Sequence, residues 1–433
     1  RHPGQYRFHS TLDPHLQRQA TEQVQQHAGQ MLRNGVGNAA AVIVDNRSFE
    51  VLAYVGNAGW GLDPERAFAV DIVQRPRSTG SILKPFLYAA MLDSGQLLPQ
   101  MLVADVPTQL RGFRPENFDR GFRGAVPADV ALAQSLNVPA VRMLRDFGYP
   151  RFHELLQQVG FTTMRRPADH YGLALILGGA EATLWDVMRA YANLADGARP
   201  AEGNAAVQRS LRWLIDDDAE SGDGSRAGAR RAASRQSLRP LSVGAAWLTQ
   251  QALRNVARPP EEAGWERFAD ARQIAWKTGT SWGLRDAWAI GSSTAHTVGV
   301  WVGNADGRGV PGLTGGGAAA PLLFALHDRL PRSPWYATPA GALKTVRTCT
   351  DDGYLATDLC SARDTLVPRR SHFDRATPYH QLVHVDVATG QRVHAGCTRL
   401  EALRAKSWFV LPPSLAYYYR AQHGHYQPLP AWR

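Results

Sequence analysis

The first regular pattern in the chain is a four-residue spacing of apolar positions that begins shortly after Asp13-Pro14. Residues at this spacing lie on one side of a helix, so the segment is predicted to pack one apolar face on another part of the protein. Asp followed by Pro is typical of a helix start, because Asp caps free N–H groups and Pro suits the first turn. The apolar positions are Leu16, Ala20, Val24, Ala28 and Leu32.

Short apolar runs separated by turns predict the strands of a five-stranded antiparallel sheet. Two strands form an early hairpin, and three follow one another late in the chain as a meander. An apolar helix at 318–330 is predicted to cover this sheet. The strands are expected at 39–45, 49–55, 271–277, 286–291 and 297–303.

Between these two groups of strands the pattern is mostly helical, over about 126–188 and from Ser81 to about Leu92. Pro85 favours a helix start near Ser81, because proline is tolerated in a first turn and is disruptive later. Residues 202–239 are rich in Ala, Arg, Ser, Gly and Asp and are interpreted as an irregular insertion. Helices grouped against an antiparallel sheet indicate an α+β fold.

The length of 433 residues allows roughly two to three domains. From about residue 333 the composition shifts to Pro, Thr, His and Cys, which predicts a separate, small β-rich region. No apolar run reaches the roughly 18 residues that would suggest a membrane span. The chain starts at Arg1 and shows no signal region, so we expect any targeting segment or anchor to lie upstream.

The net charge of +10 would attract an anionic polymer, such as nucleic acid, a lipid surface or cell wall. Basic residues are spread along the chain, which favours the simpler interpretation of an arginine-rich genome. No dense basic run is interleaved with aromatic residues, so nucleic-acid binding is not expected.

Only four of the 48 basic residues are lysines. A position that keeps lysine can require what arginine lacks, namely the ability to lose its proton in a suitable site. Two of the four stand in chemically suggestive places, Lys84 in Ser81-Ile82-Leu83-Lys84 and Lys277 in Lys277-Thr278-Gly279-Thr280. Ser135-Leu136-Asn137 lies between them. The trio S-x-x-K, S-D-N and K-T-G is the signature of β-lactamases and penicillin-binding proteins, and the three stretches resemble it.

Each motif suits one part of an acyl transfer to a serine. Ser81 is a poor nucleophile until a base takes its proton, and Lys84 lies on the same side of a helix that begins at Ser81. Burial and a second cation, Lys277, would lower the pKa of Lys84 and leave it neutral often enough to act as that base. Ser135 at a helix–loop junction could pass a proton, and Asn137 could hold a substrate carbonyl or orient Lys84.

The third motif is expected at the end of a strand. Gly279 lets an extended peptide approach the strand edge, while Thr278, Thr280 and Lys277 bind its carboxylate. Taken singly, the three motifs are also compatible with a helix N-terminus, a helix-cap pair and a Gly turn. Their joint occurrence, in this order and in these settings, favours an active site.

Two other motifs are rejected. Gly279-Thr280-Ser281-Trp282-Gly283 matches the G-x-S-x-G nucleophile elbow, but that elbow requires a strand followed by a helix, and another strand is expected here. The glycine-rich run at 312–317 lacks the Gly-Lys-Ser/Thr ending of a phosphate loop.

The three cysteines all lie in the last quarter of the chain, away from the Ser/Lys motifs. Cys349 and Cys360 are the nearest pair, but spacing alone does not fix a disulfide. A zinc site using Cys349, Cys360, His380, His384 or Cys397 is conceivable, although no C-x-x-C occurs and the spacing is weak evidence. We therefore expect neither a metal nor a cofactor.

The motifs extend into a longer resemblance to class A (bifunctional) penicillin-binding proteins, most closely the 1C subgroup. The stretch 76–86 resembles their active-site helix, 135–141 their second motif, and 276–281 with 285–288 their third. Leu177-Gly178-Gly179-Ala180-Glu181 is also similar to a family stretch. The match runs from about residue 11 to 330 and is specific over the catalytic part.

The resemblance implies a transpeptidase fold like that of serine β-lactamases, with a five-stranded sheet, helices on both faces and an all-α subdomain. It also implies a reaction in which Ser81 attacks a D-Ala-D-Ala stem peptide and cross-links peptidoglycan, with β-lactams acylating Ser81 as mimics. Lys84 would be the base, Ser135 and Asn137 would relay protons and bind substrate, and residues 277–280 would hold the terminal carboxylate. The N–H groups of Ser81 and Thr280 would form the oxyanion hole.

The resemblance further implies three parts: a linker at 1–37, a transpeptidase domain at 38–332 and a Cys/His-containing extension at 333–433. Family members carry an upstream glycosyltransferase domain and a membrane anchor, and they act on the periplasmic side of the inner membrane, where other cell-wall synthesis proteins could be partners. The 1C subgroup has a further β-sandwich after the catalytic domain. Thr377 stands where that subgroup leads us to expect cysteine, and the insertion at 202–239 is unusual.

Two alternative functions remain at this point. A serine β-lactamase shares all three motifs but needs an efficient base for deacylation, and the N-terminal linker and the added tail argue against it. A catalytically weak scaffold or sensor that binds cell-wall peptide or β-lactam is the other alternative, against which the intact Ser81/Lys84 pair argues.

Overall fold

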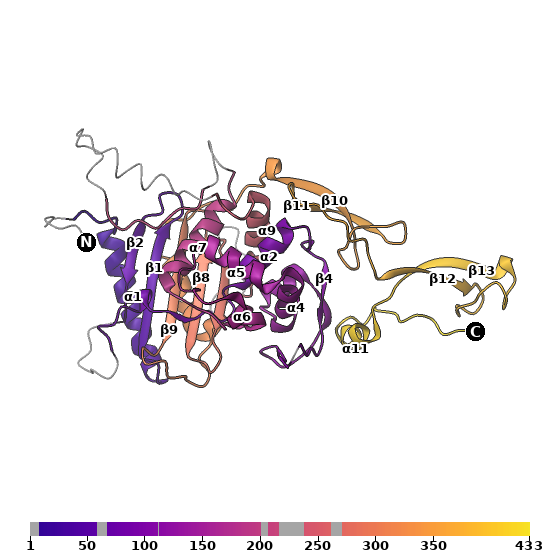
Figure 1. The fold of residues 1–433 in the computed structure, drawn as a ribbon, viewed down its shortest axis with the longest axis horizontal. Helices are drawn as coiled ribbons and strands as arrows, with labels where there is room; N and C mark the ends of the chain where they lie inside the picture. The colour runs from indigo at the N-terminus through magenta and orange to yellow at the C-terminus, as the bar shows by residue number, and fades with distance from the viewer. Residues whose placement is uncertain (1–7, 59–66, 111, 201–206, 216–237, 261–270) are drawn as a thin grey trace.

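A five-stranded antiparallel sheet in the order β2-β1-β9-β8-β7 forms the centre of the larger part of the molecule (Figure 1). The computed structural model describes residues 8–58, 67–110, 112–200, 207–215, 238–260 and 271–433. The predicted hairpin and meander are confirmed, and so is the α+β fold. The strands are β1 (Asn38–Asp45), β2 (Val51–Val55), β7 (Ala275–Thr280), β8 (Asp286–Ser292) and β9 (His296–Gly303).

Burial along the strands follows their position in the sheet. The central strands β8 and β9 are buried at every residue, whereas the edge strand β2 alternates between buried and half-buried positions. A strand covered on both faces is apolar throughout, and a strand with one face less covered shows the two-residue alternation. The other edge strand, β7, carries the third motif.

Helices cover both faces of the sheet. A side chain at Gly291 of β8 would meet His327 of α10, whereas one at Gly299 of β9 would meet Met188 of α7. Gly291 pairs with Val298, the neighbour of Gly299, so the two glycines face opposite sides of the sheet. The covering helices are α1 (Pro14–Leu32) and α10 (Ala320–His327) on one face, and α7 (Leu184–Gly197) and α9 (Val243–Arg254) on the other.

Helix α1 begins as predicted, with Asp13 accepting hydrogen bonds from the N–H groups of His15 and Leu16. The last of its five expected apolar contacts is absent, because Leu32 is 39% exposed. His27 is buried instead, and its Nε2 lies 2.7 Å from the Ala318 carbonyl oxygen. The helix expected at 318–330 is shorter, since α10 ends at His327 and follows the π-helical turn η7 (Gly315–Ala319).

An all-helical part lies beside the sheet, as expected for the middle of the chain (Figure 1). Two short two-stranded ladders connect it to the rest. Its elements are α2 (Lys84–Asp93), α3 (Ala128–Ala133), α4 (Asn137–Phe147), α5 (Tyr149–Gln158), α6 (Ala168–Tyr171) and the 3-10 helix η3 (Gly172–Leu177). The 3-10 helix η2 (Ile72–Gln74) lies instead against β1 and α7. The ladders pair β3 (Arg77–Ser78) with β6 (Glu181–Ala182), and β4 (Leu102–Asp105) with β5 (Gly124–Pro127).

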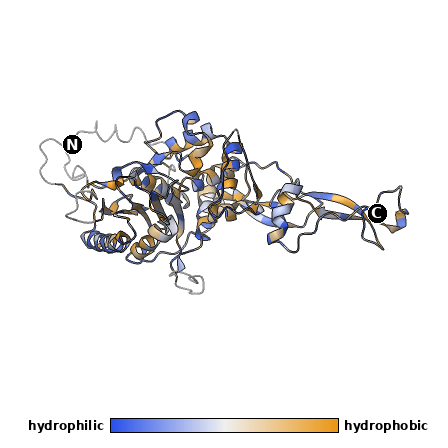
Figure 2. Cartoon of the chain, turned by 90° about the horizontal axis from the view of Figure 1, so that it is seen from below, coloured by the Kyte–Doolittle hydropathy of each residue, from blue (hydrophilic) through white to orange (hydrophobic). Residues whose placement is uncertain are grey.

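The β-rich region expected after residue 332 consists of two hairpins and one helix. The hairpin β12–β13 extends away from the rest of the molecule in both views (Figures 1 and 2). Helix α11 returns to pack on β5, where a side chain at Gly124 would meet the backbone of Leu415 and Tyr419. The elements are η8 (Ala340–Ala342), β10 (Leu343–Cys349), β11 (Ala362–Pro368), β12 (His380–Asp386), η9 (Leu400–Ala402), β13 (Leu403–Phe409) and α11 (Pro413–Gln422).

Most of the predicted insertion at 202–239 falls outside the described residues. Its described parts, 207–215 and 238–239, contribute isolated bridges, among them Glu50 with Arg212 and Val207 with Leu238. Across the described ranges, no helix combines the length and the apolarity that crossing a membrane requires.

Candidate active site

Ser81 lies in a tight turn rather than at the start of a helix. The predicted helix start was wrong by three residues, because α2 begins at Lys84. The preceding backbone forms i to i+3 hydrogen bonds, from Ile82 N–H to the Thr79 oxygen (3.2 Å) and from Lys84 N–H to the Ser81 oxygen (3.3 Å). Gly80, with φ +52°, turns the chain into this arrangement, a conformation that favours glycine.

Both sides of this turn are held by the third motif and by the stretch at 177–181. A Cβ on Gly80 would lie 2.7 Å from the backbone nitrogen and oxygen of Thr280, so the turn is pressed directly against strand β7. On the other side, Thr79 N–H donates to the Ala180 oxygen (3.0 Å). The indole of Trp288 donates to the Ser78 oxygen at 2.8 Å. These contacts fix Ser81 at the open edge of the sheet.

Lys84 is 3% exposed and directs its amino group toward the second motif. Its Nζ donates to the Ser135 carbonyl oxygen at 2.7 Å and to Asn137 Oδ1 at 2.8 Å. The Ser135 hydroxyl lies 3.5 Å away. Ser135 sits between α3 and α4 with a positive φ of 56°, which turns both its carbonyl and its hydroxyl toward the lysine.

Lys277 approaches the same hydroxyl from the sheet. Its Nζ donates to Ser135 Oγ at 2.7 Å and to the Thr278 oxygen at 2.8 Å. The strand was expected at 271–277, but β7 runs from Ala275 to Thr280. All four residues of the third motif therefore belong to the strand. The structure therefore brings two buried amino groups onto one serine.

Burial and charge repulsion act on both lysines. Burial, and secondarily the positive charge of Lys277, lowers the pKa of Lys84 well below its usual value. Burial lowers the pKa of Lys277 to about 7. Within the described residues, no carboxylate lies within 4.0 Å of either amino group. The site therefore favours a neutral Lys84 beside a lysine that retains part of its charge at neutral pH.

The edge of β7 presents backbone groups next to Ser81. Ser281 N–H donates to Asp286 of β8, so by the alternation of antiparallel strands the N–H of Thr280 points outward. Gly279 has no room for a side chain, since its Cβ would lie 2.8 Å from the Thr79 oxygen. The Thr280 hydroxyl accepts a hydrogen bond from Gly315 N–H at 3.0 Å.

The Ser81 hydroxyl itself has no hydrogen-bond partner among the described residues. The structure thus joins Lys84, Ser135, Asn137 and Lys277 by hydrogen bonds and places Ser81 beside them on the turn that leads into α2. Its hydroxyl remains available to a substrate.

One positioning residue was missed by the sequence analysis. Asn117, 3% exposed, accepts hydrogen bonds from the N–H groups of Asn137 (2.9 Å) and Val138 (3.1 Å) at the start of α4. Its amide donates to the fully buried Asp105 at 2.8 Å and to the Gly121 oxygen at 2.8 Å. Asn117 lies 20 residues before Asn137, so no local pattern marks it as the cap of this helix.

The rejection of Ser281 agrees with the fold. Ser281 is in the turn between β7 and β8, and its hydroxyl accepts a hydrogen bond from Asp286 N–H at 2.8 Å. Strand, turn and strand replace the strand and helix of a nucleophile elbow. The glycine-rich run leads into η7, where Gly315 packs on the backbone of β7 and β8.

Cys349 and Cys360 form a disulfide, while Cys397 is a free, exposed thiol. The sulfur of Cys349, a carboxylate oxygen of Asp352 and a ring nitrogen of His380 lie within 4.8 Å of one another. A sulfur in a disulfide is not a thiolate ligand, so these atoms do not fit the zinc site considered above. The exposed sulfur of Cys397 lies instead near the backbone of His394, at 3.3 Å from its carbonyl oxygen.

Comparison with known proteins agrees with this geometry. Residues 39–308 match the family described as penicillin-binding protein transpeptidase domain, and the chain belongs to this family. More particularly, it carries the transpeptidase domain of a class A penicillin-binding protein. Penicillin-binding protein 1C of Escherichia coli (strain K12) is 37% identical over 322 residues, which are 74% of this chain and 38% of that protein. The predicted resemblance is thereby confirmed.

Two further comparisons show lower sequence identity. Penicillin-binding protein 1B of Vibrio cholerae is 28% identical over 347 residues, 76% of this chain and 41% of that protein. The chain therefore spans well under half the length of these relatives. The PonA1 protein of Mycobacterium tuberculosis, solved in complex with penicillin V, shares the fold with a TM-score of 0.60 and 21% identity, covering 81% of this chain and 90% of that one.

Proposed function

We propose that this chain is a serine D,D-transpeptidase that cross-links peptidoglycan stem peptides through an acyl-enzyme on Ser81. The observation that supports this most is that Lys84 and Lys277 meet at one hydroxyl, that of Ser135, beside the turn that carries Ser81. Two amines with lowered pKa values around a single hydroxyl suit proton transfer in both directions.

Lys84 is proposed as the base that activates Ser81. A neutral amine has two N–H bonds, and these are used by the Ser135 carbonyl and by Asn137 Oδ1. Its lone pair then remains to accept the proton of Ser81 as the serine oxygen attacks the carbonyl carbon between the two D-Ala residues. The N–H groups of Ser81 and Thr280, the latter pointing out of the sheet edge, would bind the resulting oxyanion.

Collapse of the tetrahedral intermediate would break the peptide bond and release the last D-Ala as an amine. Ser135 is suited to deliver the proton from Lys84 to this amine, because Lys277 donates to its oxygen and leaves the hydroxyl hydrogen free. An amine of a neighbouring stem would then attack the ester, lose its proton along the same route and return Ser81 to its starting state.

The third motif is proposed to hold the donor peptide. Its terminal carboxylate would bind the hydroxyls of Thr278 and Thr280 and the charge of Lys277, and this carboxylate would raise the pKa of Lys277 again. Gly279 lets the turn at Thr79 and Ile82 pack directly on the strand, and an extended chain is proposed to pair with the outward edge of β7. β-Lactams would occupy the same position and acylate Ser81.

Labelling with a fluorescent penicillin, followed over hours, tests this proposal. We expect a stable adduct on the parent chain and none on Ser81→Ala. Lys84→Met, which keeps an uncharged side chain of similar length and removes the base, should retain the fold and lose at least about a hundredfold in acylation rate. Stable labelling of Ser81→Ala at another residue would refute Ser81 as the nucleophile.

The two alternatives give different outcomes. A serine β-lactamase would release the bound drug within minutes, but no carboxylate base lies near the amines of the described site. A scaffold or sensor would hold the drug and yet release no D-Ala from a lipid-linked stem substrate under any condition.

We further propose that the transpeptidase unit covers 38–332, preceded by a linker at 1–37 and followed by an extension at 333–433. It would act on the periplasmic side of the inner membrane, held by an anchor outside this chain. Stem peptides and β-lactams are the proposed ligands. No cofactor takes part in the proposed steps.

A further inference from the structure

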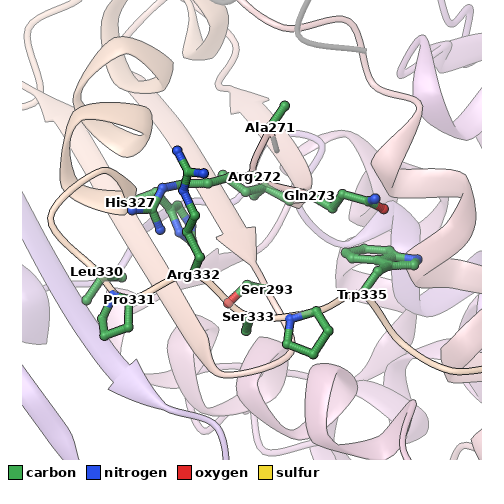
Figure 3. Close-up of a pocket in the computed structure, with 12 residues that line it drawn as sticks. Ala271, Arg272, Gln273, Ser293, His327, Leu330, Pro331, Arg332, Ser333 and Trp335 are labelled. Atoms are coloured by element: carbon green, nitrogen blue, oxygen red, sulfur yellow. The ribbon is translucent and has the colours of Figure 1, made fainter. Parts of the chain in front are cut away.

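Outside the proposed active site, a cavity of about 330 Å³ lies at the opposite end of strand β7 from the third motif (Figure 3). Both arginines that line it are already engaged, Arg272 in an ion pair with Asp328 at 3.4 Å, so the cavity offers a ligand no free cation. A different feature connects directly to the candidate site. It is a small hydrophobic core that the C-terminal extension shares with the ladder of β4 and β5, next to the second motif at 135–137.

The extension and the ladder bury apolar side chains in one cluster that is separate from the main core. An isolated two-stranded ladder is marginally stable at best in water, so this ladder depends on the parts of the protein that cover it. Helix α11 lies directly on its backbone, because a Cβ at Gly124 would be 2.5 Å from the backbone nitrogen of Tyr419. The members of the shared cluster, each at most 8% exposed, are Leu102, Val106 and Ala125 from the ladder region, and Leu411, Leu415 and Tyr419 from the extension.

The opposite face of the same ladder packs on the second motif. Val103 and Val126 are paired across the ladder, and they cluster with Leu136, the middle residue of that motif. The next pair along the strands, Ala104 with Ala125, packs in the cluster shared with the extension. Neighbouring residues of a strand point to opposite faces, so the ladder is a layer between α11 and the second motif.

A polar connection runs from the ladder to the same motif. Asp105, which is paired with Gly124 in the ladder, is fully buried and accepts a hydrogen bond from the amide of Asn117 at 2.8 Å. Asn117 in turn accepts the N–H of Asn137 at 2.9 Å, and Asn137 Oδ1 holds the amino group of Lys84 at 2.8 Å. Direct contacts therefore lead from α11 through the ladder to the proposed base.

We propose that helix α11 of the extension is a positioning element of the transpeptidase site, with Leu415 as a positioning residue. This inference rests on the proposed function. Helix α11 covers one face of the ladder, the covered ladder fixes Leu136 and Asp105, and these hold the second motif in place beside Lys84. Loosening α11 would expose apolar surface of the ladder, let the second motif move and slow acylation, although no group that reacts is removed.

Leu415→Ala tests the proposal in the full chain, with Leu16→Ala as the matched control. Both leucines are 8% exposed, and Leu16 lies on α1, which packs on β1 and β2 at the edge of the sheet away from β7. Two quantities are compared at temperatures well below melting. They are the amide hydrogen exchange of residues 135–141 and the rate of labelling at a saturating concentration of fluorescent penicillin, at which weaker binding of the drug has no effect.

We expect Leu415→Ala to exchange at least about tenfold faster over 135–141 and to label at least about tenfold more slowly, because truncating a buried leucine favours local opening of the part that it supports. Leu16→Ala should lose similar thermal stability and keep the parent values of both quantities. Leu415→Met nearly conserves the side-chain volume, so it should be closer to the parent than to Leu415→Ala in both.

The proposal is overturned if Leu415→Ala labels as fast as the parent, if Leu16→Ala slows labelling equally, or if residues 135–141 exchange no faster in Leu415→Ala than in Leu16→Ala. Should Leu415→Ala not fold, Leu415→Val replaces it as a smaller truncation, and parent values of both quantities in that variant would equally refute the role of α11. Exchange is measured without a substrate. A parent chain that fails to label would thus contradict the proposed function, while the exchange comparison still decides whether α11 supports the second motif.

Discussion

Replacing Asn117 by alanine would separate the positioning of the candidate site from its chemistry. The substitution removes four hydrogen bonds, two received from the first N–H groups of α4 and two donated to Asp105 and Gly121. At about 1 kcal/mol for each bond, the loss of stability is about 4 kcal/mol. The proposed unit 38–332 is longer than 250 residues and shifts by about 2 °C or less for each kcal/mol, so the expected drop in melting temperature is at most about 8 °C.

The same change should slow acylation. Asn137 is the first residue of α4 and its Oδ1 holds the amino group of Lys84 at 2.8 Å, so a loosened helix start misplaces the proposed base. We expect at least about a tenfold slower labelling by fluorescent penicillin, which corresponds to about 1.4 kcal/mol of barrier. Thermal unfolding measures the stability. Timed labelling, carried out well below the melting temperature of the variant, measures the acylation rate.

Asn193→Ala is the matched control for this experiment. Asn193 is also buried and forms three hydrogen bonds, each of 2.8 Å, on helix α7 away from the lysines. It should lose a similar amount of stability and keep the parent acylation rate. An Asn117→Ala variant that is destabilised but labels as fast as this control would refute the positioning role, and one that melts like the parent would refute the energetic argument.

Three further predictions concern the turn, the strand and the C-terminal region. Gly80→Ala forces a Cβ to 2.7 Å from the β7 backbone and should slow penicillin labelling at least about tenfold. Gly35→Ala is the control, because Gly35 has φ +77° and open space around it. That substitution brings only the conformational strain, about 1–2 kcal/mol. Lys277 binds its proton at a pKa of about 7 in the folded protein and about 10.4 when unfolded, so between these values the unfolded state holds more protons and stability rises with pH. The difference in urea midpoint between the parent and Lys277→Met should therefore change between pH 7 and pH 9, and a constant difference would contradict the lowered pKa. Replacing Cys349 and Cys360 by alanine opens a loop of 11 residues. By the chain-entropy argument this should lower the stability of the hairpin by about 3 kcal/mol, with no change in penicillin labelling. Slower labelling would show that the hairpin supports the active site.

Much of the fold followed from local patterns in the sequence. The hairpin at the start, the meander near residue 300 and the helical middle were predicted because alternation and helical spacing depend only on neighbouring residues. The element boundaries were less accurate. Helix α2 begins at Lys84 instead of Ser81, and β7 extends through Thr280, because hydrogen bonds to distant parts of the chain decide where each element ends.

The candidate site was predicted as a set of residue types, and its assembly came from the tertiary structure. Lys84 meets Ser135 across 51 residues and Lys277 meets it across 142, so the shared hydroxyl has no counterpart in any local motif. The long-range cap by Asn117 was not predicted for the same reason. The sequence left the pairing of the three cysteines open, and the disulfide follows from the hairpin β10–β11, which brings Cys349 and Cys360 together.

The sequence by itself determined the chemistry that the protein carries: a serine, two lysines and an edge strand with glycine, in a fixed order. Side-chain types and short spacings define these, since they depend on covalent structure and on local backbone geometry. Only the tertiary structure decided that both amines are buried beside one hydroxyl. Burial and the proximity of like charges are properties of the packed molecule, and they set the pKa values on which the proposed function depends.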